Sequence, residues 1–347
     1  VNALGTRRIK NIRLDDSLFQ GGVLPPGFDK KNTDSAYRAS VGAVALHGGT
    51  AKVSIFPSRE GKAPRVKIEP PGRYVRIDNQ ALSVSGSGST IRLAMKPDGK
   101  HSKVHVTGRI GRKRATRPIW GVRRLEDPPL ATAYAFAALI EKHCQCTINK
   151  TIKRAVTPAK ATKLGSHTSP PLFQILNIMN KESNNFVAEM VLRALAQNKE
   201  TPSTPVSWTD SQRVVRQWIA KNLALEPNAF AFNNGSGLYD GGLFSTDQVS
   251  RLLVAMNRHP HREMYRATLA IAGRDGTLKG RLMGSATVGR MVGKTGTLND
   301  VSALSGYVRT RTGQRLAFSI LINDTGGATR QMRKLQDQLV AILVEVR

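Results

Sequence analysis

Gly289-Arg-Met-Val-Gly-Lys-Thr-Gly-Thr-Leu298 is the stretch of this sequence that is most informative about the fold. Its apolar run is interrupted at Gly293, and a cation, Lys294, and a hydroxyl, Thr295, follow before Gly296 leaves the backbone without a side chain. This succession predicts an edge strand that pairs with an extended peptide, while the lysine and the threonine bind a charged end. The alternative is a surface turn that spells Lys-Thr-Gly by chance, because short motifs carry a high false-positive risk.

The residues after this stretch predict an antiparallel sheet with helical layers. Residues 301–310 and 315–323, on either side of a turn at Gly313, predict two more strands. A final helix is predicted with one apolar side formed by Met332, Leu335, Leu339 and Ile342. Three strands joined by short turns and flanked by helices are typical of an α+β fold.

A second stretch, Lys181-Glu-Ser-Asn-Asn185, interrupts an apolar face that has helical spacing on both sides. We expect Ser169 to cap the first of these helices, with Pro170 and Pro171 in its first turn. Ser183 and Asn185 then lie on a short loop between two core helices, where polar side chains can point into a cleft. The alternative is an ordinary helix cap and turn. Further along, Ser245 with Gln248 predicts a capping box.

Residues 1–166 predict a β-rich region of one or two subdomains, and residues 167–347 a second domain. The expected antiparallel strands are Ser40–Phe56 around a Gly48-Gly49 turn, Tyr74–Val84, Ser89–Met95 and Lys103–Ile110. A helix is expected from Pro128, since proline suits the first helical turn. The polar, basic stretch 149–167 is interpreted as a linker with one or two short strands.

The charge of the chain favours anionic partners. The 347 residues include 53 Lys and Arg against 24 Asp and Glu, a net charge of +29, of which residues 1–166 carry +20. Such a field suits anionic wall polymer or a membrane surface. The densest basic run, 109–117, has no interleaved aromatics, so nucleic acid is not predicted as a partner, and a solvated basic face is preferred to a dedicated patch.

The sequence predicts neither a transmembrane helix nor a metal or redox site at its cysteines. No apolar run approaches the ~20 residues that a transmembrane helix needs, the longest candidate being Ala131–Ile140. Cys144 and Cys146 are only two positions apart, and with His143 they lack the spacing of a zinc site. We interpret both cysteines as thiols rather than as a redox or metal pair.

Ser183-Asn184-Asn185 and Lys294-Thr295-Gly296 occur in the order of two of the three motifs of the penicillin-binding and β-lactamase serine acyl-enzymes. Five other stretches accompany them: Leu14–Phe19, Met179–Asn185, Asn234–Leu238, Ala272–Leu278 and Leu304–Tyr307. Together they resemble the D-alanyl-D-alanine carboxypeptidase/endopeptidase family, the low-molecular-mass class C penicillin-binding proteins. The resemblance is specific from Ser169 to Asn323 and diffuse before that.

The resemblance implies a penicillin-binding/β-lactamase-like transpeptidase domain with β-rich inserted accessory domains. It also implies an exported cell-envelope protein, periplasmic or extracytoplasmic, that acts on peptidoglycan stem peptides and β-lactams without metal or cofactor. A serine attacks the D-Ala-D-Ala amide, D-alanine leaves, and water releases the acyl-enzyme. Ser183 would relay a proton to the leaving amine, Lys294 would hold that hydroxyl by its charge, and Asn185 would hydrogen-bond the amide side chain of the substrate.

On the strand, the resemblance implies that Thr295 and Thr297 bind the terminal carboxylate. Backbone beside Gly296 would align the peptide and help to form the oxyanion hole. For Arg281 and Asp275 we prefer an ion pair that holds a loop over a role in the reaction.

One motif of the family is absent: residues 1–347 contain no Ser-x-x-Lys. The nearest sequences, Thr147-Ile-Asn-Lys150 and Thr157-Pro-Ala-Lys160, lie in the linker and out of order, so we reject them. The expectation is that a segment ahead of Val1 carries the nucleophile, and that the chain as given makes no acyl-enzyme. The alternative is a relic without a nucleophile that only binds wall peptides.

Overall fold

The computed structural model describes residues 9–38, 40–144, 148–197, 204–226, 228–239 and 241–347. The chain forms two compact units: unit 1 comprises 1–167 and 192–211, and unit 2 comprises 168–191 and 212–347. The chain passes between the units after residues 167, 191 and 211, and the last two of these boundaries fall inside helices. The functional division expected at 166/167 stays a prediction.

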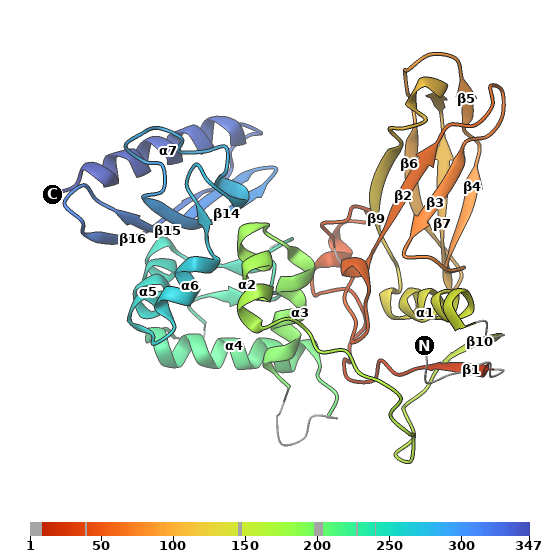
Figure 1. The fold of residues 1–347 in the computed structure, drawn as a ribbon. Helices are drawn as coiled ribbons and strands as arrows, with labels where there is room; N and C mark the ends of the chain where they lie inside the picture. Colours follow the sequence, from red (N-terminus) through yellow and green to blue (C-terminus); the bar gives the residue numbers. More distant parts are fainter. Residues whose placement is uncertain (1–8, 39, 145–147, 198–203, 227, 240) are drawn as a thin grey trace. The chain divides into compact units, whose positions relative to one another are not determined.

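Unit 1 is built from small sheets and one long helix (Figure 1). One sheet has the order β3-β2-β9, formed by Arg65–Glu69, Thr50–Phe56 and Ile119–Arg124. A second has the order β4-β7-β6, formed by Val75–Asn79, His101–Thr107 and Arg92–Asp98. Two further pairs are β5 (Leu82–Val84) with β8 (Arg109–Gly111), and β1 (Ile9–Leu14) with β10 (Ile148–Arg154). Short 3₁₀ turns occupy Phe28–Lys30, His47–Gly49 and Arg112–Arg114.

The expectation of a purely antiparallel set in this region was wrong. β4 pairs with β7, and β5 with β8, in parallel. The predicted strand at 74–84 is divided because Asn79 makes a turn: its side chain accepts from the amide of Ala81 (3.2 Å) and donates to the carbonyl of Pro64 (2.7 Å). The predicted hairpin at 40–56 is also absent, since a 3₁₀ turn replaces its bend and only β2 forms.

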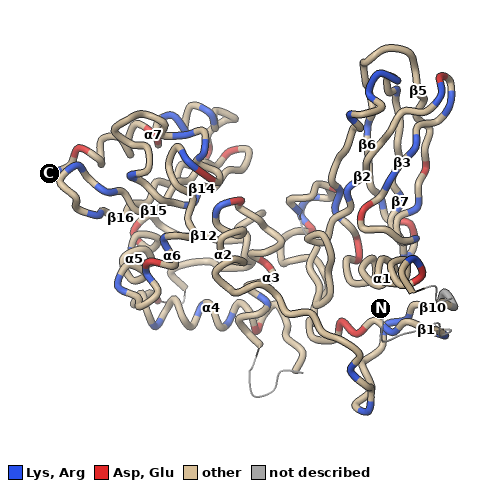
Figure 2. Tube along the Cα trace, viewed as in Figure 1, with Lys and Arg blue, Asp and Glu red and all other residues tan. Residues whose placement is uncertain are grey.

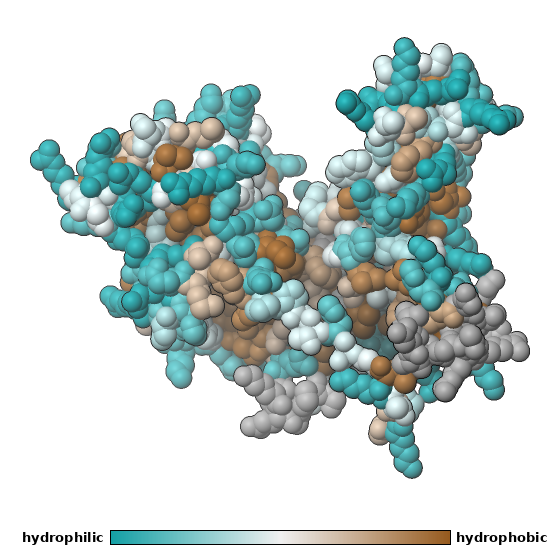
Figure 3. Space-filling model, viewed as in Figure 1, coloured by the Kyte–Doolittle hydropathy of each residue, from teal (hydrophilic) through white to brown (hydrophobic). Residues whose placement is uncertain are grey.

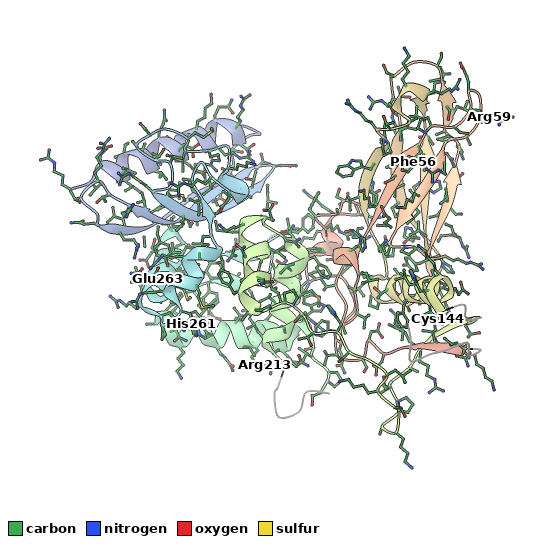
Figure 4. The ribbon with its side chains drawn as sticks, viewed as in Figure 1. Phe56, Arg59, Cys144, Arg213, His261 and Glu263 are labelled. Atoms are coloured by element: carbon green, nitrogen blue, oxygen red, sulfur yellow. The ribbon has the colours of Figure 1, made fainter. Side chains whose placement is uncertain are left out.

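The core of unit 1 lies between these sheets and α1 (Pro128–Cys144). α1 begins where the sequence predicted, and Asp127 caps it by accepting a hydrogen bond of 3.0 Å from the amide of Leu130. Cys144 is buried at the other end of α1, beside Ile140 and Ile148 (Figure 4). Cys146 lies outside the described residues.

The densest basic run lies on β8 and the 3₁₀ turn that follows it, at the end of unit 1 that carries β5 (Figure 2). Hydrophilic side chains cover this end in the face drawn in Figure 3, and Arg59 extends outward from it (Figure 4). Local bonds hold parts of the run, since Arg114 Nε donates to the carbonyl of Ser87 at 2.6 Å. Its interpretation as a solvated face remains a prediction.

Unit 2 combines a four-stranded sheet with helices. The sheet has the order β13-β14-β15-β16, formed by Ala270–Ile271, Met291–Leu298, Val301–Arg309 and Arg315–Ile322. The helices are α2 (Leu172–Lys181), α3 (Asn185–Leu195), α4 (Trp208–Leu223), α5 (Thr246–Arg258), α6 (Arg262–Thr268) and α7 (Thr329–Glu345), with α3 ending and α4 beginning in unit 1. Short elements are β11 (Ala231–Phe232), β12 (Gly242–Leu243) and the 3₁₀ turn η4 (Gly276–Leu278).

The antiparallel β14-β15-β16 order confirms the predicted strands, and the α+β class is confirmed with it. α7 covers one face of the sheet and α5 the other (Figure 1). Leu304 and Val308 of β15 pack toward Val340 and Val344 of α7. On the opposite face Tyr307 donates a hydrogen bond of 2.6 Å to the carbonyl of Leu253 in α5.

The apolar side predicted for the final helix, α7, is not the side that the sheet buries. Leu335, Leu339 and Ile342 are 43%, 37% and 63% exposed. The sheet instead buries the adjacent stripe Gln336, Val340 and Val344. The carbonyl of its polar member has a partner, because Arg281 Nη2 donates to Gln336 Oε1 at 3.1 Å.

The predicted helix starts had mixed outcomes. Ser245 and Gln248 form the predicted capping box at the start of α5. Ser169 does not cap α2, which begins at Leu172 with Pro171 at the cap position. A residue that precedes proline is kept out of the helical region, so the Pro170-Pro171 pair delays the start.

Within the described ranges, no helix has both the length and the apolar character that a membrane span requires.

Candidate active site

The bend between α2 and α3 presents Ser183 in an unusual backbone conformation. Ser183 has a φ of 53°, in the left-handed region that non-glycine residues rarely adopt. Asn184 makes the helix cap, because its Oδ1 accepts from the amide of Val187 at 3.0 Å. Asn185 is the first residue of α3. The alternative of a simple cap therefore describes Asn184, which leaves the hydroxyl of Ser183 available for another partner.

That partner is Lys294 of β14. Lys294 Nζ donates to Ser183 Oγ at 2.7 Å and to the carbonyl of Thr295 at 2.8 Å. Burial lowers the pKa of Lys294 to about 8, because the ammonium loses much of its solvation. The structure thus brings together two of the predicted site residues, from a helix junction and a strand that are distant in sequence.

The outer edge of β14 is open beside this pair. The short β13 pairs only with Val292 and Gly293. From Lys294 to Leu298, β14 has a strand neighbour on one side only, β15, among the described residues. Backbone donors and acceptors of that edge can pair with an added extended peptide. The predicted edge strand is therefore present over the part that contains Lys-Thr-Gly.

Side chains alternate along β14, so the predicted site residues divide between two faces. Lys294 and Gly296 lie on one face, while Thr295 and Thr297 lie on the face of Leu304, which α7 covers. Thr295 Oγ1 donates to Thr277 Oγ1 in η4 at 2.8 Å. Thr297 Oγ1 accepts from Arg333 Nη2 in α7 at 3.1 Å.

Thr277 and Arg333 are the contacts that reasoning from the sequence missed. Thr277 belongs to the stretch Ala272–Leu278, which contributed only to the family resemblance. Arg333 is one of three cations in α7, with Arg330 and Lys334, and no local signal in the sequence distinguishes it. Both residues reach β14 only through the tertiary fold.

An ion pair holds the end of α2 against the segment around η4. Lys181 Nζ contacts Asp275 Oδ2 at 2.5 Å, and Asp275 Oδ1 accepts from the amide of Ile271 at 2.7 Å. A Cβ on Gly276 would stand 2.6 Å from the carbonyl oxygen of Lys181, so only glycine allows this approach. The expected ion pair between Arg281 and Asp275 was wrong, because Arg281 pairs with Asp337 (2.7 Å) on α7.

A buried carboxylate supports the glycine-rich loop Asn234–Leu238. Glu189 of α3 is fully buried and accepts from the amides of Gly235 and Ser236, each at 2.9 Å. Burial raises the pKa of Glu189, and the two amide bonds act in the opposite direction. The loop is therefore held from the same helix that begins at Asn185. Sequence reasoning noted Glu189 only as part of the resemblance.

The described part of the chain contains no cluster of metal-ligating side chains. No group of three or more His, Cys, Asp or Glu side chains is arranged to hold an ion there. The chemistry that the site offers comes from hydroxyls, an ammonium, a guanidinium and backbone donors. These groups suit the binding of a carboxylate and the movement of a proton.

Comparison with known proteins assigns the chain to a family. Residues 1–346 match the D-Ala-D-Ala carboxypeptidase 3 (S13) family. A D-alanyl-D-alanine carboxypeptidase of Actinomadura sp. is 30% identical over 342 residues, which cover 94% of this chain and 62% of the relative. Carboxypeptidase DacB of Mycolicibacterium smegmatis is 22% identical, with 97% and 58% covered.

The fold is also that of a solved relative. The crystal structure of penicillin binding protein 4 (dacB) from Haemophilus influenzae superposes with a TM-score of 0.74 at 20% identity. The match covers 96% of this chain and 76% of that one. The chain spans about 60% of the length of the two curated relatives. Since the family match extends over nearly every residue, the chain belongs to the D-Ala-D-Ala carboxypeptidase 3 (S13) family.

Proposed function

We propose that this protein is a serine-type D-alanyl-D-alanine carboxypeptidase/endopeptidase that acts on peptidoglycan peptides through an acyl-enzyme and is sensitive to penicillin. One observation carries the proposal: Lys294 Nζ donates to Ser183 Oγ at 2.7 Å beside the open edge of β14. Membership of the family supports it.

The peptide ending in D-Ala-D-Ala would add to the edge of β14 as an extended strand. Backbone beside Gly296 aligns it, and Thr295 and Thr297 bind its terminal carboxylate. Asn185, at the start of α3, hydrogen-bonds the amide side chain of the substrate. The two hydroxyls lie near the end of the strand, where both faces are partly open to solvent.

The reaction would be an acyl transfer followed by hydrolysis. A serine oxygen attacks the carbonyl carbon between the two D-alanines, and the C–N bond breaks. Ser183 relays the serine's proton to the departing amine, and the ammonium of Lys294 keeps the hydroxyl of Ser183 in place. Water then attacks the ester, which releases the shortened peptide as an acid and restores the serine.

No residue of this chain is assigned as the attacking serine, because residues 1–347 contain no Ser-x-x-Lys. The proposal therefore concerns the whole protein. A second candidate is a peptidoglycan-binding protein without a nucleophile. It would use the same edge of β14 to hold wall peptides.

The substrate places the proposed activity outside the cytoplasmic membrane, at the cell envelope. β-Lactams would enter as analogues of the D-Ala-D-Ala end. The charge of residues 1–166, a net +20, suits attachment to anionic wall polymer or to a membrane surface.

The test is to incubate the whole protein with a labelled penicillin and with an acylated peptide ending in D-Ala-D-Ala. We expect a covalent adduct of one penicillin per protein by mass spectrometry, together with release of D-alanine. Ser183→Ala should slow both reactions, whereas the matched variant Ser319→Ala, on β16, should slow neither. Peptide binding without an adduct and without D-alanine would reject the enzyme and favour the binder.

A further inference from the structure

We propose that Arg333 of α7 binds the terminal carboxylate of the substrate and makes the site selective for peptides with an unblocked C-terminus. The inference rests on the proposed function, which puts that carboxylate at Thr295 and Thr297. Thr295 and Thr297 offer two neutral hydroxyls, and Arg333 adds a permanent positive charge. This charge comes from α7, a helix that contains none of the sequence motifs.

The first argument is position. Arg333 lies in the second turn of α7, and its Nη2 donates to Thr297 Oγ1 at 3.1 Å. Thr297 and Thr295 project from the same face of β14, so one anion can lie beside both hydroxyls and the guanidinium. Lys294 projects from the other face, where its ammonium is engaged by Ser183 and by the carbonyl of Thr295.

The second argument is charge. Across the described ranges of the chain, no carboxylate lies within ion-pair distance of Arg333. Its neighbour Arg281, in contrast, is paired with Asp337 at 2.7 Å. A guanidinium has five donors, and the bond to Thr297 uses only one of them. The others can form the bidentate contact with a carboxylate that a lysine or a hydroxyl cannot form.

The third argument is rigidity. Arg281 Nη2 donates to the main-chain carbonyl of Arg333 at 3.1 Å while the same guanidinium holds Asp337. The side chain of Arg281 itself is only 13% exposed. The turn of α7 that carries Arg333 is therefore tied to the segment after η4. That segment begins beside Thr277, the hydrogen-bond partner of Thr295.

The test measures binding to the whole protein, by NMR titration, of two probes: an acylated peptide ending in D-Ala-D-Ala and the same peptide with a C-terminal amide. For the wild type we expect tighter binding of the acid. Arg333→Gln should weaken the acid by about tenfold and leave the amide almost unchanged. Arg333→Lys should restore part of the preference, because it keeps the charge without the fork.

The matched control is Arg330→Gln, which removes the same charge one turn earlier on α7, at an exposed position. It should leave the ratio of acid to amide affinity as in the wild type. An equal loss in both arginine variants would show a general field effect and overturn the proposal. An unchanged ratio in Arg333→Gln would overturn it as well.

Hydrolysis is measured separately, so the two proposals can fail independently. A protein that binds the acid through Arg333 but releases no D-alanine would reject the carboxypeptidase and leave the carboxylate contact standing. If the Arg333→Gln variant hydrolyses the peptide and keeps the same preference for the acid, the carboxylate contact is rejected and the carboxypeptidase proposal stands.

Discussion

Lys294 Nζ donates to Ser183 Oγ at 2.7 Å from a position where burial lowers the pKa of the lysine to about 8. The charge that holds the hydroxyl is therefore present below about pH 8 and absent above it. We predict that acylation of the whole protein by a labelled penicillin slows as the pH rises through about 8. The measurement is a pH profile of the second-order rate constant, and a profile that stays flat across this range would contradict the assignment.

The same pKa predicts how stability depends on pH. Between about 8 and the ordinary lysine value of 10.5, the unfolded state binds more protons at this position than the folded state. The free energy of unfolding should therefore rise with pH across that interval. Lys294→Met should remove this contribution, which urea titrations at several pH values would detect as a smaller slope. An identical slope in the variant would disprove it.

Substitutions of Ser183 should change the rate of acylation much more than the stability of the fold. Ser183→Ala removes the hydroxyl that Lys294 holds, and we expect penicillin acylation to slow by roughly 10²–10⁴. Ser183→Gly should slow it equally but keep stability within about 1 kcal/mol, because the relief of a φ of 53° offsets the added freedom of the unfolded chain. Urea unfolding checks the second part. A glycine variant that is much less stable than the alanine variant would argue against strain at this residue.

The ion pair between Lys181 and Asp275 should position the bend before Ser183. Its side chains are 15% and 38% exposed. Lys181→Met should lower the free energy of unfolding by about 1–3 kcal/mol, because a partly buried carboxylate loses its partner. The matched control is Arg251→Met, which breaks the exposed pair with Asp247 and should cost about 0.3–0.5 kcal/mol. Equal losses, measured by urea unfolding, would remove any special role for the first pair.

Glu189 should determine the order of loop 234–238. Glu189→Gln keeps one acceptor for the amides of Gly235 and Ser236 but turns a donor toward the other, at a cost of about 1–3 kcal/mol. Hydrogen exchange should show faster exchange at these two amides, while the amides of β15 keep their protection. Unchanged protection of the loop would mean that Glu189 does not hold it.

Local rules predicted the elements whose causes are local. The helix at Pro128 and the capping box at Ser245 depend on neighbouring residues, and β14, β15 and β16 are runs of strand-forming residues bounded by turns; a sequence displays all of these signals. The meeting of Ser183 with Lys294 could be anticipated only from the resemblance.

Other features depend on partners that are distant in sequence. Parallel pairing of β4 with β7 is a non-local choice that alternation does not encode. The buried side of α7 contains Gln336, whose partner Arg281 is distant in sequence, and two adjacent apolar stripes made the pattern ambiguous. The contact of Arg333 with Thr297 arises because a surface helix passes the end of a strand, and periodicity contains no information about it.

α3 begins at Asn185 and carries Glu189 four residues later, on the same side of the helix. A shift of α3 would therefore move the bend with Ser183 and the loop 234–238 together. Substitutions that tilt or lengthen α3 would move both the bend with Ser183 and loop 234–238. A change in the preferred peptide is therefore easier to reach by replacing single side chains than by moving the backbone.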